Sequence, residues 1–316
     1  MARYVVPYNT YNWAVADVGI THRFNLPLVR ACRALILHLT ATATGALVDQ
    51  SPESMITKIL VRADTHVIVD MDGAEAWILS SMLGFATSPK DVSVITTPCS
   101  TIVIPFGERY ALDLPSYKQV SVELTFATAI TRGAATTFPT LAVRTLGIEQ
   151  DDAPIRTAKG GRLGRRFLRS QFTMAAGDVV CQLPETEAYN GLLLCALDAC
   201  DSTVFTLDQN WGNITNITAY AEIPGNRLRL LDGVDYKALC DLGQFEGGIG
   251  QGEAALAIGA TLYKKRFVGV AYCDLSNSGG ERPLDLPGLK ASKLTVLPTA
   301  TGATQLSIVR DTIVEG

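Results

Sequence analysis

Charged residues are scarce in this chain. Asp, Glu, Lys and Arg make up only 18% of its 316 residues, against about 25% in a typical soluble domain. The formal net charge is -4, so the chain lacks the basic character of proteins that bind nucleic acid through its phosphates. A charge-poor surface is often covered by a partner. We therefore expect protein contacts and no sequence-specific nucleic-acid binding.

Metal-binding and catalytic motifs are also missing. The three histidines, His22, His38 and His66, all lie in the first half, whereas a cupin-type metal site needs several on neighbouring strands. The seven cysteines form no CxxC motif, which favours buried thiols in a reducing compartment. No GxSxG or GxxxxGK[ST] motif occurs. We expect no catalytic residue, no cofactor and no tightly bound transition metal, so the chain is predicted not to be an enzyme.

Long hydrophobic runs are absent as well. The longest segments without a charge or histidine are 92–107 and 294–309, and both contain Thr, Ser and Pro. Each is shorter than the roughly 18 apolar residues that a membrane helix needs. The first residues, Met1-Ala2-Arg3, do not lead into an apolar segment of the secretory type. We expect a soluble protein.

Short strand-like runs recur along the whole chain. Residues 120–126 alternate between apolar and polar side chains, which is typical of a half-buried strand. Gly, Pro, Asn and Asp separate the runs as turn formers. Two short helices are predicted at 75–83 and 252–263, and the fold class is predicted to be all-β. Strands are predicted at 34–42, 56–62, 66–71, 100–105, 119–128, 141–146, 191–197, 203–207, 214–221, 227–231, 267–273 and 304–313.

An internal repeat is the most informative feature. Residues 107–118 read GERYALDLPSYK and residues 280–290 read GERPLDLPGLK. A weaker pair lies upstream in the same order: Ile56-Thr57-x-Ile59 resembles Ile214-Thr215-x-Ile217. Because both pairs are in register, apart from loop insertions, we infer two copies of one β domain. A chance coincidence of common turn residues is the alternative.

The repeat predicts where the two domains meet. Residues 147–164 show no strand pattern and are rich in Gly and charge, as in a linker. The predicted organisation is a first domain with an N-terminal arm at 1–150, a basic Gly-rich linker at 151–164 and a second domain at 165–316.

Two segments have the composition of contact elements. Tyr4, Tyr8, Tyr11 and Trp13 make the N-terminal arm rich in aromatics, and such residues are enriched at interfaces. Packing of the arm on its own domain is an equal alternative; under the first interpretation, removal of residues 1–13 leaves both domains folded. Around the linker, basic side chains can meet phosphates, lipid headgroups or acids of a neighbouring subunit. These are Arg156, Lys159, Arg162, Arg165, Arg166 and Arg169.

Two tandem β domains of roughly 150 residues, the duplicated Leu-Asp-Leu-Pro turn at 112–115 and 284–287, and few charges resemble one protein family. The family comprises the double jelly-roll major capsid proteins of tailless icosahedral viruses with an internal membrane, which infect bacteria or archaea. The resemblance implies two eight-stranded antiparallel jelly-roll sandwiches with short helices in loops. It also implies a homotrimer that forms a pseudo-hexagonal capsomer of the virion shell, made in the host cytoplasm.

The resemblance implies partners too. The main one is the chain itself, in trimers and between capsomers, and minor capsid proteins, membrane proteins or lipid headgroups are further candidates on the inner face. Two alternatives stay open at this point. A bicupin-type enzyme is disfavoured by the histidine count, and a two-domain carbohydrate-binding protein could use Trp13, Trp77 and Trp211 as sugar platforms. A glycan array distinguishes the second alternative from a capsid protein.

Overall fold

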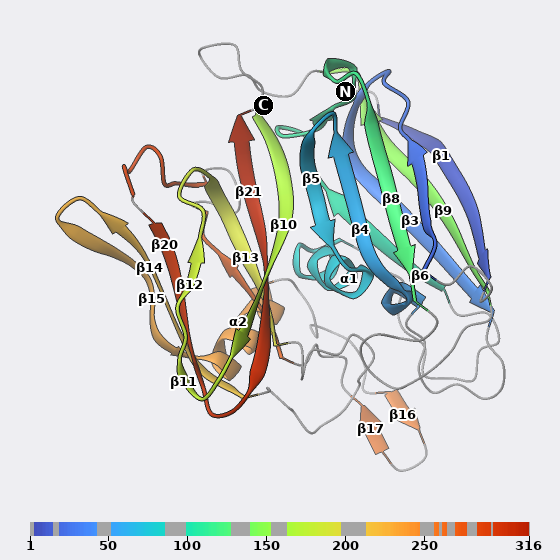
Figure 1. The fold of residues 1–316 in the computed structure, drawn as a ribbon. Helices are drawn as coiled ribbons and strands as arrows, with labels where there is room; N and C mark the ends of the chain where they lie inside the picture. Colours follow the sequence, from blue (N-terminus) through green and yellow to red (C-terminus); the bar gives the residue numbers. More distant parts are fainter. Residues whose placement is uncertain are drawn as a thin grey trace.

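The fold was analysed in a computed structural model of the chain. Figure 1 shows two β-sandwiches side by side, with most strands running upright and both chain ends near the top. The structure describes residues 3–14, 19–42, 52–85, 99–127, 140–152, 163–196, 213–246, 256–258, 261–263, 269–276, 283–291 and 293–315. Within these ranges, no helix is long and apolar enough to cross a membrane.

The first repeat is a sandwich of two antiparallel layers. One layer, called here the first outer sheet, has the strand order β1-β9-β3-β6, with the short β7 beside β3. The other layer has the order β5-β4-β8-β2 and belongs to a larger central sheet. The strands of the first repeat are β1 (Arg3–Ala14), β2 (Thr21–Asn25), β3 (Ala31–Thr42), β4 (Ile56–Ala63), β5 (His66–Met71), β6 (Cys99–Pro105), β7 (Leu112–Asp113), β8 (Val120–Phe126) and β9 (Thr140–Gln150).

The second repeat has the same plan. The order β10-β21-β13-β18, with β19 beside β13, completes the central sheet, and β20-β14-β15 with β11 and β12 form the second outer sheet. A two-stranded hairpin of β16 and β17 stands apart. These strands are β10 (Leu163–Met174), β11 (Gly177–Asp178), β12 (Cys181–Leu183), β13 (Ala188–Ala196), β14 (Ile214–Ile223), β15 (Asn226–Asp235), β16 (Leu256–Ile258), β17 (Thr261–Tyr263), β18 (Val270–Asp274), β19 (Leu284–Asp285), β20 (Lys293–Ala300) and β21 (Thr304–Glu315).

In the described part of each repeat, one α-helix follows the edge strand, β5 in the first repeat and β15 in the second. The helix α1 (Gly73–Met82) follows β5, and its N-cap Asp72 forms a capping box with Glu75. The helix α2 (Tyr236–Glu246) follows β15, and the Asp235 carboxylate accepts a hydrogen bond from the Ala238 backbone N–H at 2.9 Å. The prediction of a helix at 75–83 is confirmed. The prediction at 252–263 is wrong, because the described part of that segment forms β16 and β17.

Strand pairing aligns the two repeats residue by residue. The Leu-Asp turn strand pairs with Ala31 and Cys32 in the first repeat, and with Ala188 and Tyr189 in the second. Both β3 and β13 shift register directly after these pairs. Likewise, β4 and β14 shift register just after Ile56 and Ile214. The two sequence repeats therefore occupy matching places, and the predicted fold class of two tandem jelly rolls is confirmed.

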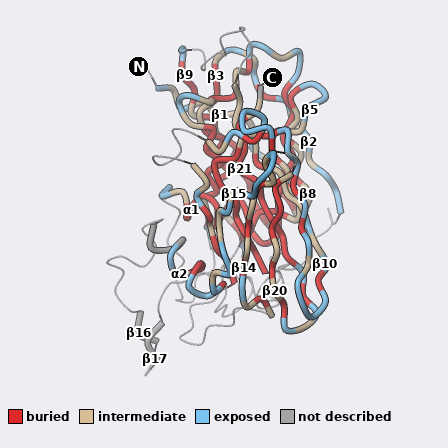
Figure 2. The backbone as a smooth tube through the Cα atoms, turned by 90° about the vertical axis from the view of Figure 1, so that its left-hand side faces the viewer, coloured by how far each residue is buried: buried red, intermediate tan, exposed pale blue. Residues whose placement is uncertain are grey.

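The central sheet joins the repeats into one body. A short parallel pairing of Phe167 and Leu168 in β10 with Val69 and Asp70 in β5 makes the sheet continuous. Figure 2 shows buried backbone through the middle of the strands and exposed backbone at the loops. One core cluster combines Trp13 and Trp77 of the first repeat with residues of the second, and a separate cluster fills the second sandwich.

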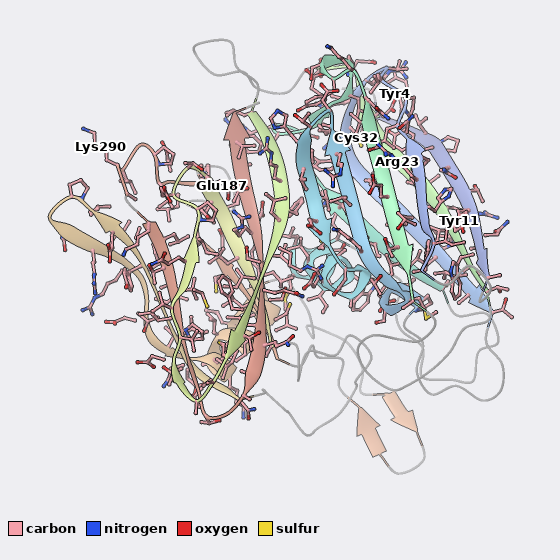
Figure 3. All side chains as sticks on the ribbon, in the orientation of Figure 1. Tyr4, Tyr11, Arg23, Cys32, Glu187 and Lys290 are labelled. Carbon is pink, nitrogen blue, oxygen red and sulfur yellow. The ribbon has the colours of Figure 1, made fainter. Side chains whose placement is uncertain are left out.

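The N-terminal segment is a strand of the first sandwich. Along its length β1 pairs antiparallel with β9, from Arg3–Gln150 to Ala14–Thr140. Trp13 is fully buried in the core, and Tyr8 and Tyr11 pack against it. Figure 3 shows Tyr4 and Tyr11 at opposite ends of this region of the sandwich. Of the two interpretations of this segment, packing on its own domain is confirmed and a separate contact arm is wrong, because β1 pairs with β9 along its length and corresponds to β10 of the second repeat.

Candidate assembly surface

The two repeats meet at a surface that combines buried apolar side chains with ion pairs. It consists of the face of β10, β21, β13 and β18 that points away from the core of the second sandwich. Phe167, Leu193 and Val309 on this face are fully buried and belong to the core of the first repeat. Phe167 lies 6.5 Å from Phe106 between ring centroids. The burial of these apolar side chains between the repeats holds the two sandwiches against each other.

A buried ion pair fastens β10 to α1. The Arg169 guanidinium lies 3.4 Å from the Glu75 carboxylate and 3.5 Å from the Asp72 carboxylate, and the Glu75 side chain is fully buried. The Ser307 hydroxyl of β21 donates a hydrogen bond to Glu75 at 2.5 Å. Because a buried carboxylate is costly without partners, these contacts specify how α1 sits on the second repeat.

A second cluster of interacting polar side chains lies on the same face, two strand positions along β10 from Phe167. Arg165 pairs with the buried Asp311, and the Tyr272 hydroxyl donates to Asp311 at 3.1 Å. Burial and the Asp311 charge raise the pKa of Tyr272 well above its usual value, so the hydroxyl keeps its proton. Burial alone would lower the pKa of Arg165, but Asp311 raises it, so the guanidinium stays charged. A Cβ at Gly191 would collide with the Tyr272 hydroxyl, so glycine is needed there.

The predicted basic segment is divided between described and undescribed residues. Arg156, Lys159 and Arg162, with the linker 153–162, lie outside the described residues. Arg165, Arg166 and Arg169 belong to β10. Two of them form the ion pairs above, and burial lowers the pKa of Arg166. Arg165 and Arg169 thus bind acids of the same chain rather than phosphates, and the domain boundaries 1–150 and 165–316 stay a prediction.

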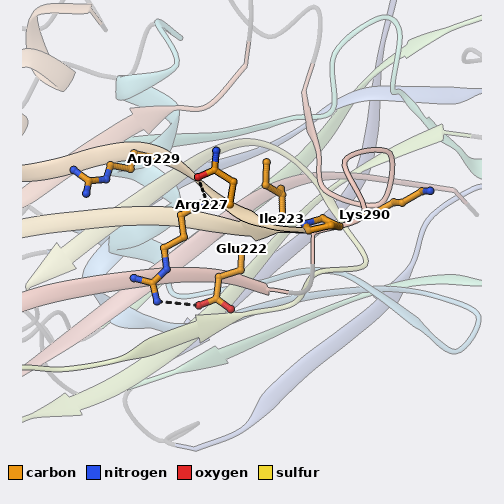
Figure 4. Close-up of a pocket in the computed structure, with 7 residues that line it drawn as sticks. Glu222, Ile223, Arg227, Arg229 and Lys290 are labelled. Carbon is orange, nitrogen blue, oxygen red and sulfur yellow. Dashed lines mark hydrogen bonds and ion pairs between the residues drawn. The ribbon is translucent and has the colours of Figure 1, made fainter.

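A surface hollow lies at the tip of the β14–β15 hairpin. Its volume is about 650 Å³. Figure 4 shows Arg227 beside Glu222, to which it is ion-paired at 3.5 Å, while Lys290 extends away from the hairpin. Arg227 also stacks over the Tyr220 ring at 4.6 Å. The lining residues are Glu222, Ile223, Pro224, Asn226, Arg227, Arg229 and Lys290. The arginine is satisfied by its own neighbours, so the hollow does not define a ligand site.

Candidate metal-binding side chains are dispersed in the described ranges. No three His, Cys, Asp or Glu side chains there are arranged to hold a metal ion. His38 contacts Thr101 at 3.2 Å, and His22 stacks on Tyr11 with ring centroids 3.9 Å apart. Cys32 and Cys181 are buried, and burial raises the pKa of each thiol to about 12, which makes them unreactive. The absence of catalytic, cofactor and metal sites stays a prediction for the whole chain.

The fold defines a class of protein, the double jelly rolls, and solved structures of this class match the whole chain. The major capsid protein of Sulfolobus Turreted Icosahedral Virus aligns over 100% of this chain and 97% of its own, with a TM-score of 0.72 and 11% identity. That of bacteriophage PM2 aligns over 100% of this chain and 98% of its own, with a TM-score of 0.60 and 11% identity. The resemblance inferred from the sequence is confirmed at the level of the fold.

A third match is VP54 of PBCV-1, in a structure fitted into a reconstruction of the virophage Sputnik. It covers 99% of this chain and 93% of its own, with a TM-score of 0.60 and 9% identity. No protein-family model matches the chain, and no curated protein sequence is significantly similar to it. The particular relationship is therefore one of fold: this chain is similar to viral major capsid proteins along its entire length.

The sequence marked Arg165 and Arg169 as contact residues, but it did not indicate the strand that carries them, their acidic partners in the same chain, or the role of Phe167 where the two repeats meet. Phe167, Arg165 and Arg169 lie in β10, which starts in the segment interpreted as a linker. Phe167 and Phe172 are signals of a strand, but three basic residues between 163 and 174 obscure the pattern, and the acidic partners of Arg165 and Arg169 lie far away in the sequence.

Proposed function

We propose that this chain is the major capsid protein of a tailless icosahedral virus and that it is a structural building block rather than an enzyme. The observation that carries the proposal is the fold of the entire chain. Both sandwiches and their junction align with viral major capsid proteins, with TM-scores up to 0.72. Only 18% of the residues are charged, which suits a surface that is largely covered in an assembly.

In this proposal the chain acts as a homotrimer. Two similar sandwiches per chain give a trimer six similar units, and such a capsomer fills a pseudo-hexagonal place in a shell. A closed ring buries every copy of the same contact, which leaves no unsatisfied surface. Capsomers then contact one another in the virion after synthesis in the host cytoplasm. Minor capsid proteins, membrane proteins and lipid headgroups are the further partners of the inner face.

Light scattering combined with electron microscopy on the purified full-length protein tests the proposal. We expect a mass of three times 33.9 kDa, or larger shell-like particles. Association of this kind should bury more than about 1,000 Å² per contact, so the trimer should persist on dilution. A monomer across micromolar concentrations, with no particles in micrographs, would contradict the proposal, and a glycan array would then test the carbohydrate-binding alternative.

A further inference from the structure

The residue-by-residue alignment of the two repeats exposes a contrast between equivalent faces. In the second repeat, the outward face of β10, β21, β13 and β18 is buried against the first repeat. On the matching face of the first outer sheet, formed by β1, β9, β3 and β6, several of the described residues are exposed or partly exposed. Arg3 pairs with Gln150, and Arg165 pairs with Ile313 at the matching place of the second repeat. Arg3 therefore corresponds to Arg165, and Val5, two residues further along, corresponds to Phe167.

Exposure differs sharply at these equivalent positions. Val5 is 69% exposed, whereas Phe167 is 0% exposed. Ile148, Leu146 and Ile36 extend the apolar surface around Val5 and are partly exposed. Their equivalents Asp311, Val309 and Leu193 are all fully buried. The first outer sheet thus presents an apolar face at the place where the other repeat is covered.

The elements of the first repeat that cover the second repeat also have equivalents in the second repeat, and these equivalents are exposed. Inside the chain, the second repeat is covered by the edge of β5 and by α1. Their equivalents are β15, which has a free edge in the described strand order, and α2. Counted from the N-caps Asp72 and Asp235, Leu79 of α1 corresponds to Leu242 of α2. Leu79 is 1% exposed and Leu242 is 51% exposed.

We propose that β15 and α2 of one subunit cover the first outer sheet of the next subunit, and that this contact reproduces the joint between the two repeats. It deepens the proposed function, on which it rests, by naming the surfaces that join the subunits. In the chain, Val69 of β5 pairs in parallel with Phe167, and strand pairing equates Val69 with Leu231. Val5 therefore lies beside Leu231 of the neighbouring subunit, in parallel strands that join the first outer sheet of one subunit to the second outer sheet of the other.

Charge supports the same arrangement. Ser307, which contacts Glu75 at the start of α1, corresponds to the exposed Arg144 on the first outer sheet. The start of α2 carries Asp235, so opposite charges meet at this point of the contact. The buried network of the chain's own joint is not repeated, because Ala34, Val103 and Ile148 replace Gly191, Tyr272 and Asp311. The contact between subunits is consequently more apolar than the joint within the chain.

The proposed contact between subunits joins two different surfaces, so it has a direction. One surface of the first repeat meets a different surface of the second, so the contact is head-to-tail and forms a ring when its rotation closes. In the proposed trimer, three joints within chains alternate with three joints between chains. The free edges of β1 and β15 are thereby satisfied, which removes two strand edges that otherwise promote aggregation.

Substitution of Val5 tests this contact without touching the fold. Val5→Asp is expected to reduce the trimer fraction at a fixed micromolar concentration by at least tenfold in mass photometry, because it places a carboxylate in an apolar contact. Its circular dichroism spectrum should match the wild type, because the side chain is exposed in the chain. The matched control is Val180→Asp. Val180 is 59% exposed and lies between β11 and β12, at the edge of the second outer sheet opposite to β15. This variant should assemble normally.

A cross-linking experiment identifies the contact directly. Val6 corresponds to Leu168, and Asp232 follows Leu231 as Asp70 follows Val69; Leu168 and Asp70 are paired within the chain. In a Cys99→Ser background, the double variant Val6→Cys with Asp232→Cys should give covalent dimers and trimers with a short thiol cross-linker, and each single variant should give none. If the wild type is trimeric but Val5→Asp assembles normally and no cross-link forms, this inference is wrong and the proposed function stands. If the wild type is a monomer, the proposed function itself fails.

Discussion

The two repeats share one fold but differ in what covers their equivalent sheets. The face around Phe167 in the second repeat is buried and contains ion pairs to Asp311, Asp72 and Glu75. The surface around Val5 in the first repeat is apolar, and Val5 itself is 69% exposed. The two repeats of this chain thus differ at these equivalent faces, whereas each sandwich keeps a buried core of its own.

The difference also explains why one joint contains buried charge. Within a chain, the second repeat is always present, so partners for Glu75 and Asp311 are guaranteed once the chain folds. Between subunits, a charge on the contact face is solvated in the free monomer and loses that solvation on association, which is costly. An apolar face such as that of Val5 and Leu146 is stabilised when it is covered and carries no such desolvation cost.

The largest effect is expected from removal of β1. Deletion of residues 3–14 takes away an edge strand paired along its length with β9 and removes the buried Trp13. We expect the loss of cooperative thermal unfolding, because a buried tryptophan alone contributes about 3–5 kcal/mol. Circular dichroism and calorimetry measure the outcome. A truncated protein that unfolds cooperatively near the wild-type temperature would show that β1 is a dispensable arm after all.

The second effect separates the two equivalent positions. Phe167→Ala should destabilise the folded chain by about 4 kcal/mol, since it leaves a cavity in the shared core. Val5→Ala should change the stability of the monomer by no more than about 0.5 kcal/mol, since the side chain is exposed there. Urea unfolding at concentrations below the association range measures both. Equal effects of the two substitutions would contradict the assigned exposure of the two faces.

The third effect concerns the ion pair between the repeats. Arg169→Met leaves Asp72 and Glu75 at the start of α1 without their cation, and we expect a loss of about 3 kcal/mol. The triple variant with Asp72→Asn and Glu75→Gln should recover part of that loss, because the uncompensated charge is gone. Chemical denaturation of the three proteins provides the test. Additive losses in the triple variant would show that the residues do not act as a pair.

The smallest effect concerns the turn between β4 and β5 in the first repeat, which contains Asp64. In the first repeat the Asp64 carboxylate accepts hydrogen bonds from the backbone N–H groups of Lys118 and Gln119, at 3.0 Å and 2.9 Å. Asp64→Ala should cost about 1 kcal/mol through these lost bonds. Asp64→Asn keeps an acceptor and tolerates the positive φ of 51° better than alanine. It should unfold closer to the wild type, and the opposite order would contradict the role of the carboxylate.

Local patterns predicted much of the fold and little of the joint. The Leu-Asp-Leu-Pro turns and the alternating strand 120–126 depend on neighbouring residues, so they were recognisable in the sequence. The strand β1 was missed because a register shift between Pro7 and Asn9 changes the phase of its aromatics. The contact of β10 with the first repeat could not be predicted, because Arg169 and Arg165 form ion pairs with acidic residues more than ninety positions away in the sequence.

Helix α2 shows the same limit from another side. Its segment 236–246 follows directly from β15, and its N-cap interaction uses the last residue of that strand, Asp235. The predicted helix at 252–263 had a favourable composition but includes a described hairpin, Leu256–Ile258 with Thr261–Tyr263. Intrinsic helix preference is a weak guide when tertiary context decides the structure.

The most direct test of the account is a cryo-electron microscopy map of the purified oligomer. We expect three chains around one axis, six sandwiches in a ring, and β15 of each subunit running parallel to β1 of the next, with Val5 buried beside Leu231. A map in which two chains meet across a two-fold axis, or in which the first outer sheet and Val5 face solvent in a closed ring, would contradict it.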